Sequence, residues 1–327
     1  MITYRRAALE DIGPAFNLAL RVFMEFEAPV SDTEAIERLQ ADFAHKKTRS
    51  DIWITGGRLM FVALDCGTVI GIADARENGH IQSFYVDSTY HRRGIGTELL
   101  SRMVCELKLR GFNKITSDAS PYALPFYHNF GFSPMDVEQK KDGFICIPMV
   151  YKPGEIWDIL DEHGNKTGRY TERGRKMATG DYHLVVHVWK RNNRGEWLID
   201  KRALTRGTSI DGKWETTGGA ALAGEDSLTA ALRETREELG IELDPQKGTL
   251  FNTTDRHGND GHTWLQDAWV FEWNGSIEDV RFQESETCDV MWARTDKIRE
   301  MIGSGEFLSA WFYLYFDEMA KKWEAES

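Results

Sequence analysis

The sequence predicts a two-domain protein of mixed α/β and α+β class, in which each half is a sheet flanked by helices. The chain has 327 residues, of which 41% are hydrophobic, which is enough to bury two cores. Strand-like and helix-like hydrophobic patterns alternate in both halves. A Pro153-Gly154 breaker follows the apolar run 144–150. We therefore expect one domain over residues 1–152 and a second over 153–327.

The first half alternates amphipathic helices with short apolar strands. Its clearest local signal is Asp65-Cys66-Gly67, a turn between two strand-like runs that predicts a hairpin. The expected helices are 9–23, 33–45, 95–110 and 121–130, and the expected strands are 59–65, 68–75, 80–87, 114–119 and 144–150.

The second half begins with a strand-turn-strand over 156–170 and ends in a helical segment over 296–323. Between them, a charged helix interrupts a series of strands, which is the order of a sheet covered by helices. That helix is expected over 226–239, and the strands over 183–190, 196–202, 249–254, 263–273 and 288–294.

Composition and charge exclude several classes of function. The formal net charge is −12, and residues 153–327 carry −11 of it. Acidic surfaces do not attract phosphate backbones, so we expect no nonspecific nucleic-acid binding. No apolar run approaches the ~18 residues of a membrane span, and no secretory signal is visible. The four cysteines lack C-x-x-C spacing, which favours a reduced cytoplasmic protein; the oligomeric state stays open.

A glycine-rich turn follows the strand over 80–87. The segment 91–96 reads HRRGIG and leads directly into the helix over 95–110. Amide groups at a helix N-terminus bind anions, glycine lets a phosphate approach the backbone, and the arginines add positive charge. An ordinary helix-start turn shows the same local pattern, so the turn alone leaves both interpretations open.

Together with the segment 126–132, which reads FYHNFGF, this turn resembles the GNAT family of acetyl-CoA-dependent N-acetyltransferases over residues 1–152. The family's turn reads Gln/Arg-x-x-Gly-x-Gly/Ala, so His91 departs from it at the first position. The resemblance implies that acetyl-CoA is the co-substrate and that the backbone of Tyr85 and Val86 pairs with its pantetheine arm. It also implies that the pyrophosphate is held by Arg92, Arg93, Gly94, Ile95, Gly96 and Thr97.

Within the later motif, Tyr127 matches the residue that commonly protonates the departing thiolate. A phenol, with an unperturbed pKa near ~10, donates a proton to a thiolate and regains it from solvent. A buried core aromatic is the alternative interpretation. Ser120 stands where the motif often has asparagine and is counted among the cofactor-binding positions. Glu25 and Glu27 lie where the family recognises amine acceptors, but they fit a solvated surface equally well and receive no catalytic role.

Residues 219–241 form the most informative stretch of the chain. Glu234, Glu237 and Glu238 follow Arg233 directly and share one face of the expected helix. Clustered carboxylates repel one another unless a cation sits among them, and Mg²⁺ is usually held by carboxylates plus substrate phosphates. The pattern therefore predicts a metal site that handles a phosphorylated substrate, against the alternative of a solvated acidic helix.

The spacing of this stretch resembles the signature of the Nudix hydrolases, and the resemblance extends over residues 153–327. Thr235 is its one soft departure, because the family more often has an aliphatic residue there. Arg233 is expected to orient the glutamates through ion pairs. The matching positions are Gly219, Glu225, Arg233, Glu234, Glu237, Glu238, Gly240 and Ile241.

The Nudix resemblance implies an α/β/α sandwich and metal-dependent hydrolysis of a diphosphate linkage in a nucleotide-type substrate. It assigns Glu237 and Glu238 as ligands of Mg²⁺ or Mn²⁺. It makes Glu234 a further ligand or the base that activates water. The Gly219 carbonyl completes the shell, and Glu286 fits the acidic position that a later loop often supplies.

Segments 180–189 and 214–219 resemble the Nudix branch related to isopentenyl diphosphate isomerase. That isomerase needs a cysteine just before the Nudix helix, and residues 203–230 contain none, so isomerase chemistry is disfavoured. His183 and His187 share one strand face and are either a metal-binding pair or structural residues. Neither the diphosphate nor the amine is identified by the sequence.

These resemblances predict a bifunctional enzyme that transfers acetyl groups from acetyl-CoA to an amine and hydrolyses a diphosphate. The alternative is a hydrolase regulated by a first domain that senses acyl-CoA without transferring anything. The changes at His91 and Ser120 motivate the alternative, and the retained Tyr127 argues against it.

Overall fold

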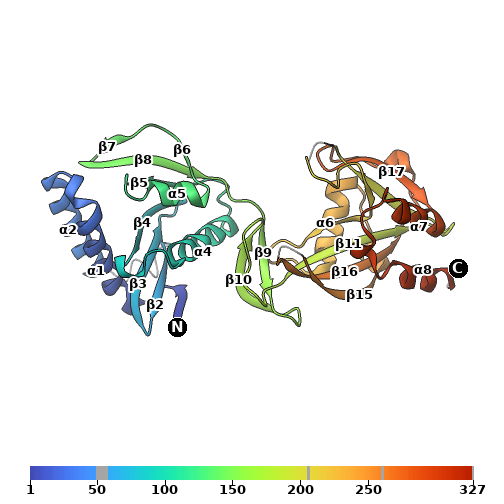
Figure 1. The fold of residues 1–327 in the computed structure, drawn as a ribbon, viewed down its shortest axis with the longest axis horizontal. Coiled ribbons are helices and arrows are strands. Elements are labelled where there is room, and N and C mark those ends of the chain that lie inside the picture. The colour runs from blue at the N-terminus through green and yellow to red at the C-terminus, as the bar shows by residue number, and fades with distance from the viewer. Residues whose placement is uncertain (49–57, 205–206, 259–260, 326–327) are drawn as a thin grey trace. The chain divides into compact units, whose positions relative to one another are not determined.

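The structure, a computed structural model, divides into two compact units, each a mixed α/β fold as predicted (Figure 1). The first unit comprises Met1–Ile156 and Tyr170–Arg173, and the second comprises Trp157–Arg169 and Gly174–Ser327. The structure describes residues 1–48, 58–204, 207–258 and 261–325.

An eight-stranded sheet forms the first unit. Its strands are β1 (Ile2–Arg6), β2 (Leu59–Asp65), β3 (Thr68–Ala75), β4 (His80–Val86), β5 (Ile115–Ala119), β6 (Ser133–Pro134), β7 (Gln139–Lys141) and β8 (Phe144–Tyr151). They are ordered β1-β2-β3-β4-β5-β8-β6, with β7 paired to β8. The parallel pair β4 and β5 is joined only at His80–Thr116 and Ile81–Ser117. Beyond Ile81, therefore, the side of β4 that faces β5 has no strand partner among the residues that the structure describes.

Helices cover both faces of this sheet (Figure 1). Helices α1 (Leu9–Phe26) and α2 (Thr33–Thr48) pack on one face, and α4 (Ile95–Leu109) and α5 (Leu124–Phe130) on the other. The alternation along β2 explains both cores, because successive side chains of a strand point to opposite faces. Val62 lies in the core beneath α1, and its neighbour Ala63 lies in the core beneath α4.

A seven-stranded sheet forms the second unit. Its strands are β11 (His183–Arg191), β12 (Trp197–Arg202), β13 (Trp214–Glu215), β14 (Thr217–Ala220), β15 (Gly248–His257), β16 (Thr263–Glu272) and β17 (Thr287–Ala293). The order is β13-β12-β11-β16-β15, with β14 paired to β11 and β17 to β12. Strands β11 and β16 are parallel. A separate hairpin is formed by β9 (Ile156–Leu160) and β10 (Lys166–Glu172).

Two cores lie on opposite faces of this second sheet, as a sandwich requires. Helix α6 (Ser227–Leu239) packs against Val186 and Val188 on one face. Helices α7 (Thr295–Ser304) and α8 (Phe316–Ala325) cover the other face, around the fully buried Trp189.

Several elements differ from the sequence expectations, among them the short strands β6, β7 and β13, which were not expected. Strands β1 and β14 were not expected, because β1 has only five residues and β14 reads TGGA, which resembles a turn. The helical segment expected over 296–323 is instead α7, a 3-10 turn η5 (Ala310–Tyr313) and α8, because Gly305, at a φ of +80°, ends α7. In the described part of the chain, no helix has the length and apolar character needed to cross a membrane.

Candidate functional site

The glycine-rich turn of the first unit opens α4. Gly94 is the N-cap residue, at a φ of +79°, and no side chain in the described part of the chain caps the helix. The first amide groups of α4 therefore lack side-chain acceptors, and Arg92 and Arg93 beside them are exposed. A left-handed backbone at Gly94 favours glycine, so this residue is required by the shape of the turn.

The remaining residues of the turn divide between packing and exposure. A Cβ at Gly96 would lie 3.2 Å from the ring of Phe126 and 3.3 Å from that of Phe84, so this glycine is required by packing. Ile95 is buried and anchors the helix start, whereas Thr97 is exposed. The turn thus exposes backbone at Gly94 together with the side chains of Arg92, Arg93 and Thr97.

The end of β4 leads into this turn. Val86 pairs with Gly71 of β3 on one side, and Tyr85 is half-buried beside it. The Nε2 atom of His91 lies 2.9 Å from the Val86 carbonyl, and its ring lies 5.6 Å from that of Phe26. The histidine that departs from the family turn therefore holds the end of β4 in place.

Tyr127 lies where β4 and β5 part. Its side chain is 3% exposed, and burial raises the pKa of its phenol. The Oγ atom of Ser117 lies 3.0 Å from the Tyr127 hydroxyl and 3.1 Å from the Ile81 carbonyl. Ser120 is also buried, but its Oγ accepts from the amide of Ala123, the residue before α5, at 3.3 Å.

Glu27 is a candidate to which the sequence assigned no role. It is half-buried at the end of α1, and burial raises its pKa to about 7. Its charge also raises the pKa values of Tyr85 and Tyr127. Glu25, by contrast, is exposed and accepts from Ser88 at 3.1 Å. Local sequence does not separate these two carboxylates; the packing of α1 does.

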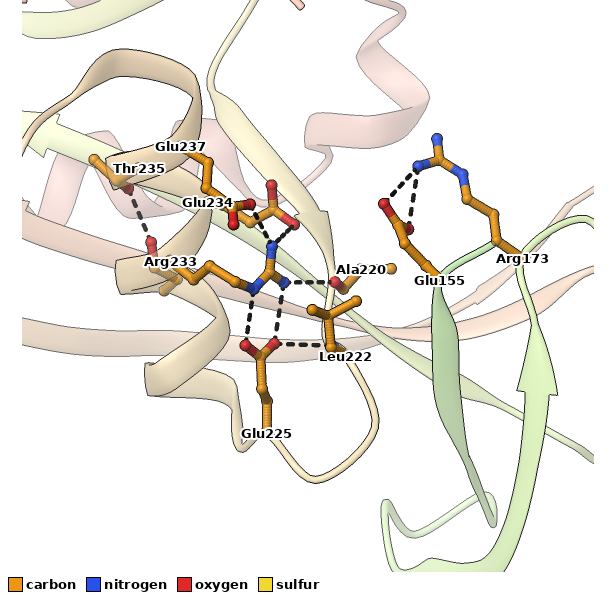
Figure 2. Close-up of polar contacts among 10 residues, drawn as sticks. Glu155, Arg173, Ala220, Leu222, Glu225, Arg233, Glu234, Thr235 and Glu237 are labelled. Carbon is orange, nitrogen blue, oxygen red and sulfur yellow. Dashed lines mark hydrogen bonds and ion pairs between the residues drawn. The ribbon is translucent and has the colours of Figure 1, made fainter. Parts of the chain in front are cut away.

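In the second unit, the guanidinium of Arg233 joins the glutamates of the motif into one hydrogen-bonded network (Figure 2). Its Nε and Nη2 donate to the two oxygens of Glu225 at 2.8 and 3.0 Å, and Nη2 also donates to the Ala220 carbonyl at 3.0 Å. Its Nη1 donates to Glu234 and Glu237, both at 2.9 Å. Burial opposes the charge, but these ion pairs outweigh it and raise the pKa of Arg233.

This network explains the spacing that the sequence shows. Glu225 also accepts from the Leu222 amide at 2.8 Å, which fixes the loop before α6. A Cβ at Gly219 would lie 2.2 Å from Glu234 Oε1, so any side chain there would displace that carboxylate. Arg233 orients the glutamates through ion pairs, as its place in the motif predicted.

Glu238 lies on the inner side of the same helix. Burial raises its pKa well above the usual value, and the negative charges of Asp200, Glu215 and Glu234 raise it further. The positive charge of Lys190 acts in the opposite direction. A carboxylate among three other acids is a group that a bound cation would stabilise in its ionised form.

A buried lysine network behind Glu238 was not expected from the sequence. Lys190 is fully buried, donates to Thr217 Oγ1, and lies 3.8 Å from Asp200. Thr217 Oγ1 in turn donates to Asp200 at 2.8 Å. Burial lowers the pKa of Lys190 and raises that of Asp200. In the sequence, Lys190 is a charged residue in an apolar strand. The signal for its burial is that Lys190 lies on the same strand face as Val186 and Val188, which pack against α6.

Glu215 is a second residue that the sequence analysis did not select. Arg202 donates to it at 2.5 Å. Burial opposes the charge of Arg202, but the negative charges of Glu215, Glu238 and Glu286 outweigh it and raise its pKa. Glu286, the residue that the Nudix resemblance suggested as the later acid, is half-buried in the turn before β17.

The donors gathered here suit a hard divalent cation. They are carboxylates and one backbone carbonyl, which is the oxygen set that Mg²⁺ and Mn²⁺ take. Among the residues that the structure describes, no three His, Cys, Asp or Glu side chains converge closely enough to hold an ion. The reason is visible in Figure 2, where Arg233 draws Glu234 and Glu237 toward itself.

His183 and His187 are structural residues of the opposite sheet face. His187 Nδ1 lies 2.8 Å from the Tyr315 hydroxyl, and burial lowers its pKa to about 3. The ring of His183 stacks on Trp157 at 4.4 Å, and burial lowers its pKa to about 4. Of the two interpretations that the sequence left open, these contacts favour the structural one.

Comparison with known proteins identifies both units. Residues 27–153 match the acetyltransferase (GNAT) domain family, and residues 181–311 match the NUDIX domain family. An uncharacterized Nudix hydrolase of Listeria innocua is 35% identical over 159 residues, which cover 48% of this chain and 90% of that protein. The isopentenyl-diphosphate Delta-isomerase of Escherichia coli is 30% identical over 105 residues, covering 31% of this chain and 57% of that enzyme.

Among solved structures, the PaiA N-acetyltransferase of Thermoplasma acidophilum in complex with coenzyme A gives a TM-score of 0.40 at 20% identity. It covers 46% of this chain and 99% of that one. The glutamate spacing, the matched domain families and the Listeria relative agree with one another. The chain belongs to the Nudix hydrolase family and carries an acetyltransferase (GNAT) domain before its Nudix domain.

Proposed function

We propose that residues 153–327 hydrolyse a diphosphate linkage in a nucleotide-type substrate, with Mg²⁺ or Mn²⁺ as the cofactor. The observation that carries this proposal is the Arg233 network, which fixes Glu234 and Glu237 on the same helix as the half-buried Glu238. Glu234, Glu237, Glu238, the Gly219 carbonyl and Glu286 would hold the metal, and Glu215 joins them because its charge acts on Glu238.

A divalent metal bound to these oxygens supplies charge neutralisation on the phosphates and lowers the pKa of bound water. The chain's own residues do the rest. Glu225 and Arg233 hold the glutamates in place before the substrate arrives, so little reorganisation is needed during the reaction. Glu234 is the base that takes the proton of the attacking water, or a further ligand. The charge of the buried Lys190 favours the ionised form of Glu238, and that of Asp200 opposes it.

For residues 1–152 we propose acetyl transfer from acetyl-CoA to an amine. The free amides at the start of α4 and the exposed Arg92 and Arg93 support binding of the pyrophosphate. The unpaired side of β4 beyond Ile81 supports pairing with the pantetheine arm. These features rest on backbone geometry, so the changes at His91 and Ser120 leave them intact.

Two side chains face the place where this transfer would occur. Glu27, with a pKa of about 7, is the residue suited to accept the proton that the amine loses. Tyr127 stays protonated because burial raises its pKa, and it donates to the departing thiolate. The thiolate then takes that proton, and solvent restores the phenol. This pair of groups favours transfer over the alternative of a domain that only senses acyl-CoA.

Each activity is tested by its own substrate screen on the full chain. Nucleoside di- and triphosphates, sugar nucleotides and dinucleotides are incubated with Mg²⁺ or Mn²⁺, and released phosphate or pyrophosphate is measured. A panel of amines with acetyl-CoA tests the first domain. If acetyl-CoA alters hydrolysis while no amine is acetylated, the first domain is a sensor and the transfer proposal fails. The free cysteines keep the cytoplasm as the proposed compartment.

A further inference from the structure

Three polar side chains, two of them buried and one half-buried, lie together on the face of the Nudix sheet opposite α6. Arg256 pairs with Trp264 across β15 and β16, Gln266 with Thr254, and Asn252 with Ala268. Directly paired residues of antiparallel strands share a face, and the diagonal neighbours of Gln266 are therefore Arg256 and Asn252. Diagonal Cβ atoms are about 7–8 Å apart, which long side chains can bridge.

Each of these side chains has a polar atom without a partner. The Nε and Nη2 atoms of Arg256, Oε1 of Gln266 and Oδ1 of Asn252 are buried and have no hydrogen-bond partner among the described residues. Arg256 is 5% exposed and Gln266 fully buried. Unpaired buried polar groups are costly, and several on one face are not expected unless something else satisfies them.

Arg256 is the most informative of the three. Buried arginines normally pair with a carboxylate, yet no acidic side chain of the described residues forms an ion pair with it. Its guanidinium instead lies 5.1 Å from the ring centre of Trp311. Burial lowers the pKa of Arg256, so the folded protein holds this cation against its own solvation. A ligand that accepts hydrogen bonds from Arg256 would compensate this cost.

The orientation of the Gln266 amide follows from its one contact. Its Nε2 donates to the Phe312 carbonyl at 3.1 Å, and a carbonyl can only accept. Oε1 is therefore the atom that faces the unsatisfied side. The site consequently offers donors from Arg256 and an acceptor from Gln266 at adjacent positions.

This combination selects the chemistry of the ligand. A bare oxyanion would satisfy Arg256 but would face the oxygens of Gln266 and Asn252, which repel it. A ring that carries a carbonyl next to an N–H satisfies both, because Arg256 donates to the carbonyl and Gln266 accepts from the N–H. Guanine and uracil have such a lactam edge, and arginine and glutamine are residues that read base edges elsewhere.

Aromatic side chains surround the same positions. Trp264 and Trp311 lie edge to face with ring centres 5.5 Å apart, and Trp311 is 38% exposed. Indole rings stack on planar bases. The 3-10 turn η5 carries Trp311, whose ring lies against the Arg256 guanidinium.

The site also connects with the glutamates on the other side of the sheet. The ring of Tyr313 lies 5.0 Å from that of His187, and the charge of Glu215 raises the pKa of Tyr313. His187 pairs across the sheet with Gly218, the residue before Gly219. The spacing between strands and the rise along them put the Cα atoms of Arg256 and Gly219 about 17 Å apart. The arginine side chain and an extended nucleotide together span this distance.

From this arrangement we infer that Arg256 and Gln266 bind the lactam edge of a heteroaromatic base, the end of the substrate that is not cleaved. The inference rests on the proposed hydrolase function for its placement within the substrate. It narrows the substrate class to nucleotides of guanine, uracil or a ring with the same edge. Adenine and cytosine lack the paired carbonyl and N–H.

Calorimetric titration of the full chain with nucleosides, in chelator and without metal, tests this site separately from hydrolysis. Guanosine and uridine are expected to bind more tightly than adenosine. In Arg256→Met, guanosine affinity should fall about 10- to 100-fold, because a hydrogen bond from a charged donor is lost. The matched control is Arg299→Met, an exposed arginine paired with Asp317, which should bind as the wild type does.

Thermal unfolding of the same variants guards against a merely structural role. Arg256→Met removes an uncompensated buried cation, so the free protein should melt at the same temperature as the wild type or higher. Equal guanosine affinity in Arg256→Met and wild type overturns the assignment. So does Arg256-dependent binding of inorganic phosphate without nucleoside discrimination, which is the behaviour of an anion site. Failure to hydrolyse any diphosphate leaves these binding results unaffected.

Discussion

Replacement of Arg233 by lysine should separate the geometry of the Arg233 network from its charge. The arginine makes five contacts, two to Glu225 and one each to Ala220, Glu234 and Glu237. A lysine ammonium keeps the charge but has three donors at a single point. At least two contacts are therefore lost, and the carboxylates are no longer spaced by a planar fork.

The expected loss follows from these contacts. Hydrogen bonds to charged groups contribute about 1.5–3 kcal/mol each, and the partial exposure of Glu237 reduces the sum, so Arg233→Lys should cost about 2–4 kcal/mol. For a domain of this size that lowers the melting temperature by on the order of 10 °C. All tryptophans except Trp53 lie in residues 153–327, so their fluorescence follows the unfolding of the Nudix domain.

The matched control lies on the same helix. Arg236 is exposed and pairs only with Glu242, at 2.6 Å, so Arg236→Lys should change stability by no more than about 0.5 kcal/mol. Hydrolysis by Arg233→Lys should also fall by at least ~10-fold, because the glutamates lose their fixed positions. A melting temperature within 2 °C or so of the wild type, with full turnover, would refute the orienting role.

Three further results are expected. Acetyl-CoA should raise the melting temperature of the full chain by mass action, and Gly94→Glu should abolish the shift by placing a side chain and a negative charge at the turn; a retained shift excludes the site. Tyr127→Phe should lower acetyl transfer by about 10²-fold or more with acetyl-CoA affinity unchanged, and equal turnover would remove Tyr127 from the mechanism. His183, whose pKa burial lowers to about 4, binds its proton first in the unfolded chain. Its contribution to the free energy of unfolding is therefore full above pH ~6.5 and falls by up to about 3 kcal/mol toward pH 4. In urea unfolding, His183→Gln should make stability less dependent on pH. The control His163→Gln, at an exposed position, should leave the pH dependence unchanged.

Patterns that are local in sequence predicted most of the fold. The turn Asp65-Cys66-Gly67 joins β2 and β3 as expected, with Asp65 paired to Thr68. The Nudix spacing was readable for the same reason, because Glu225 and Arg233 meet across one loop and two helical turns. Strand β14 was not expected, because its glycines are required by long-range contacts. A Cβ at Gly218 would lie 2.4 Å from the Val186 carbonyl.

The remainder of the site depends on burial and on strand pairing, which local sequence does not encode. Glu27 and Glu25 are two residues apart and chemically alike, yet only Glu27 is desolvated by the packing of α1. Lys190 is one residue in an apolar strand until β12 brings Asp200 beside it. Arg256 is notable only because the residues packed around it include no acid to pair with it among those described.

The central claim is metal-dependent hydrolysis at the glutamate cluster, and Glu238→Gln tests it most directly. With the best substrate of the screen, wild-type hydrolysis should vanish in chelator and return with Mg²⁺ or Mn²⁺. Glu238→Gln should lower turnover by at least ~10²-fold, and Glu242→Gln, an exposed carboxylate outside the cluster, should not. Near-wild-type turnover by Glu238→Gln, or hydrolysis that persists in chelator, would contradict the account.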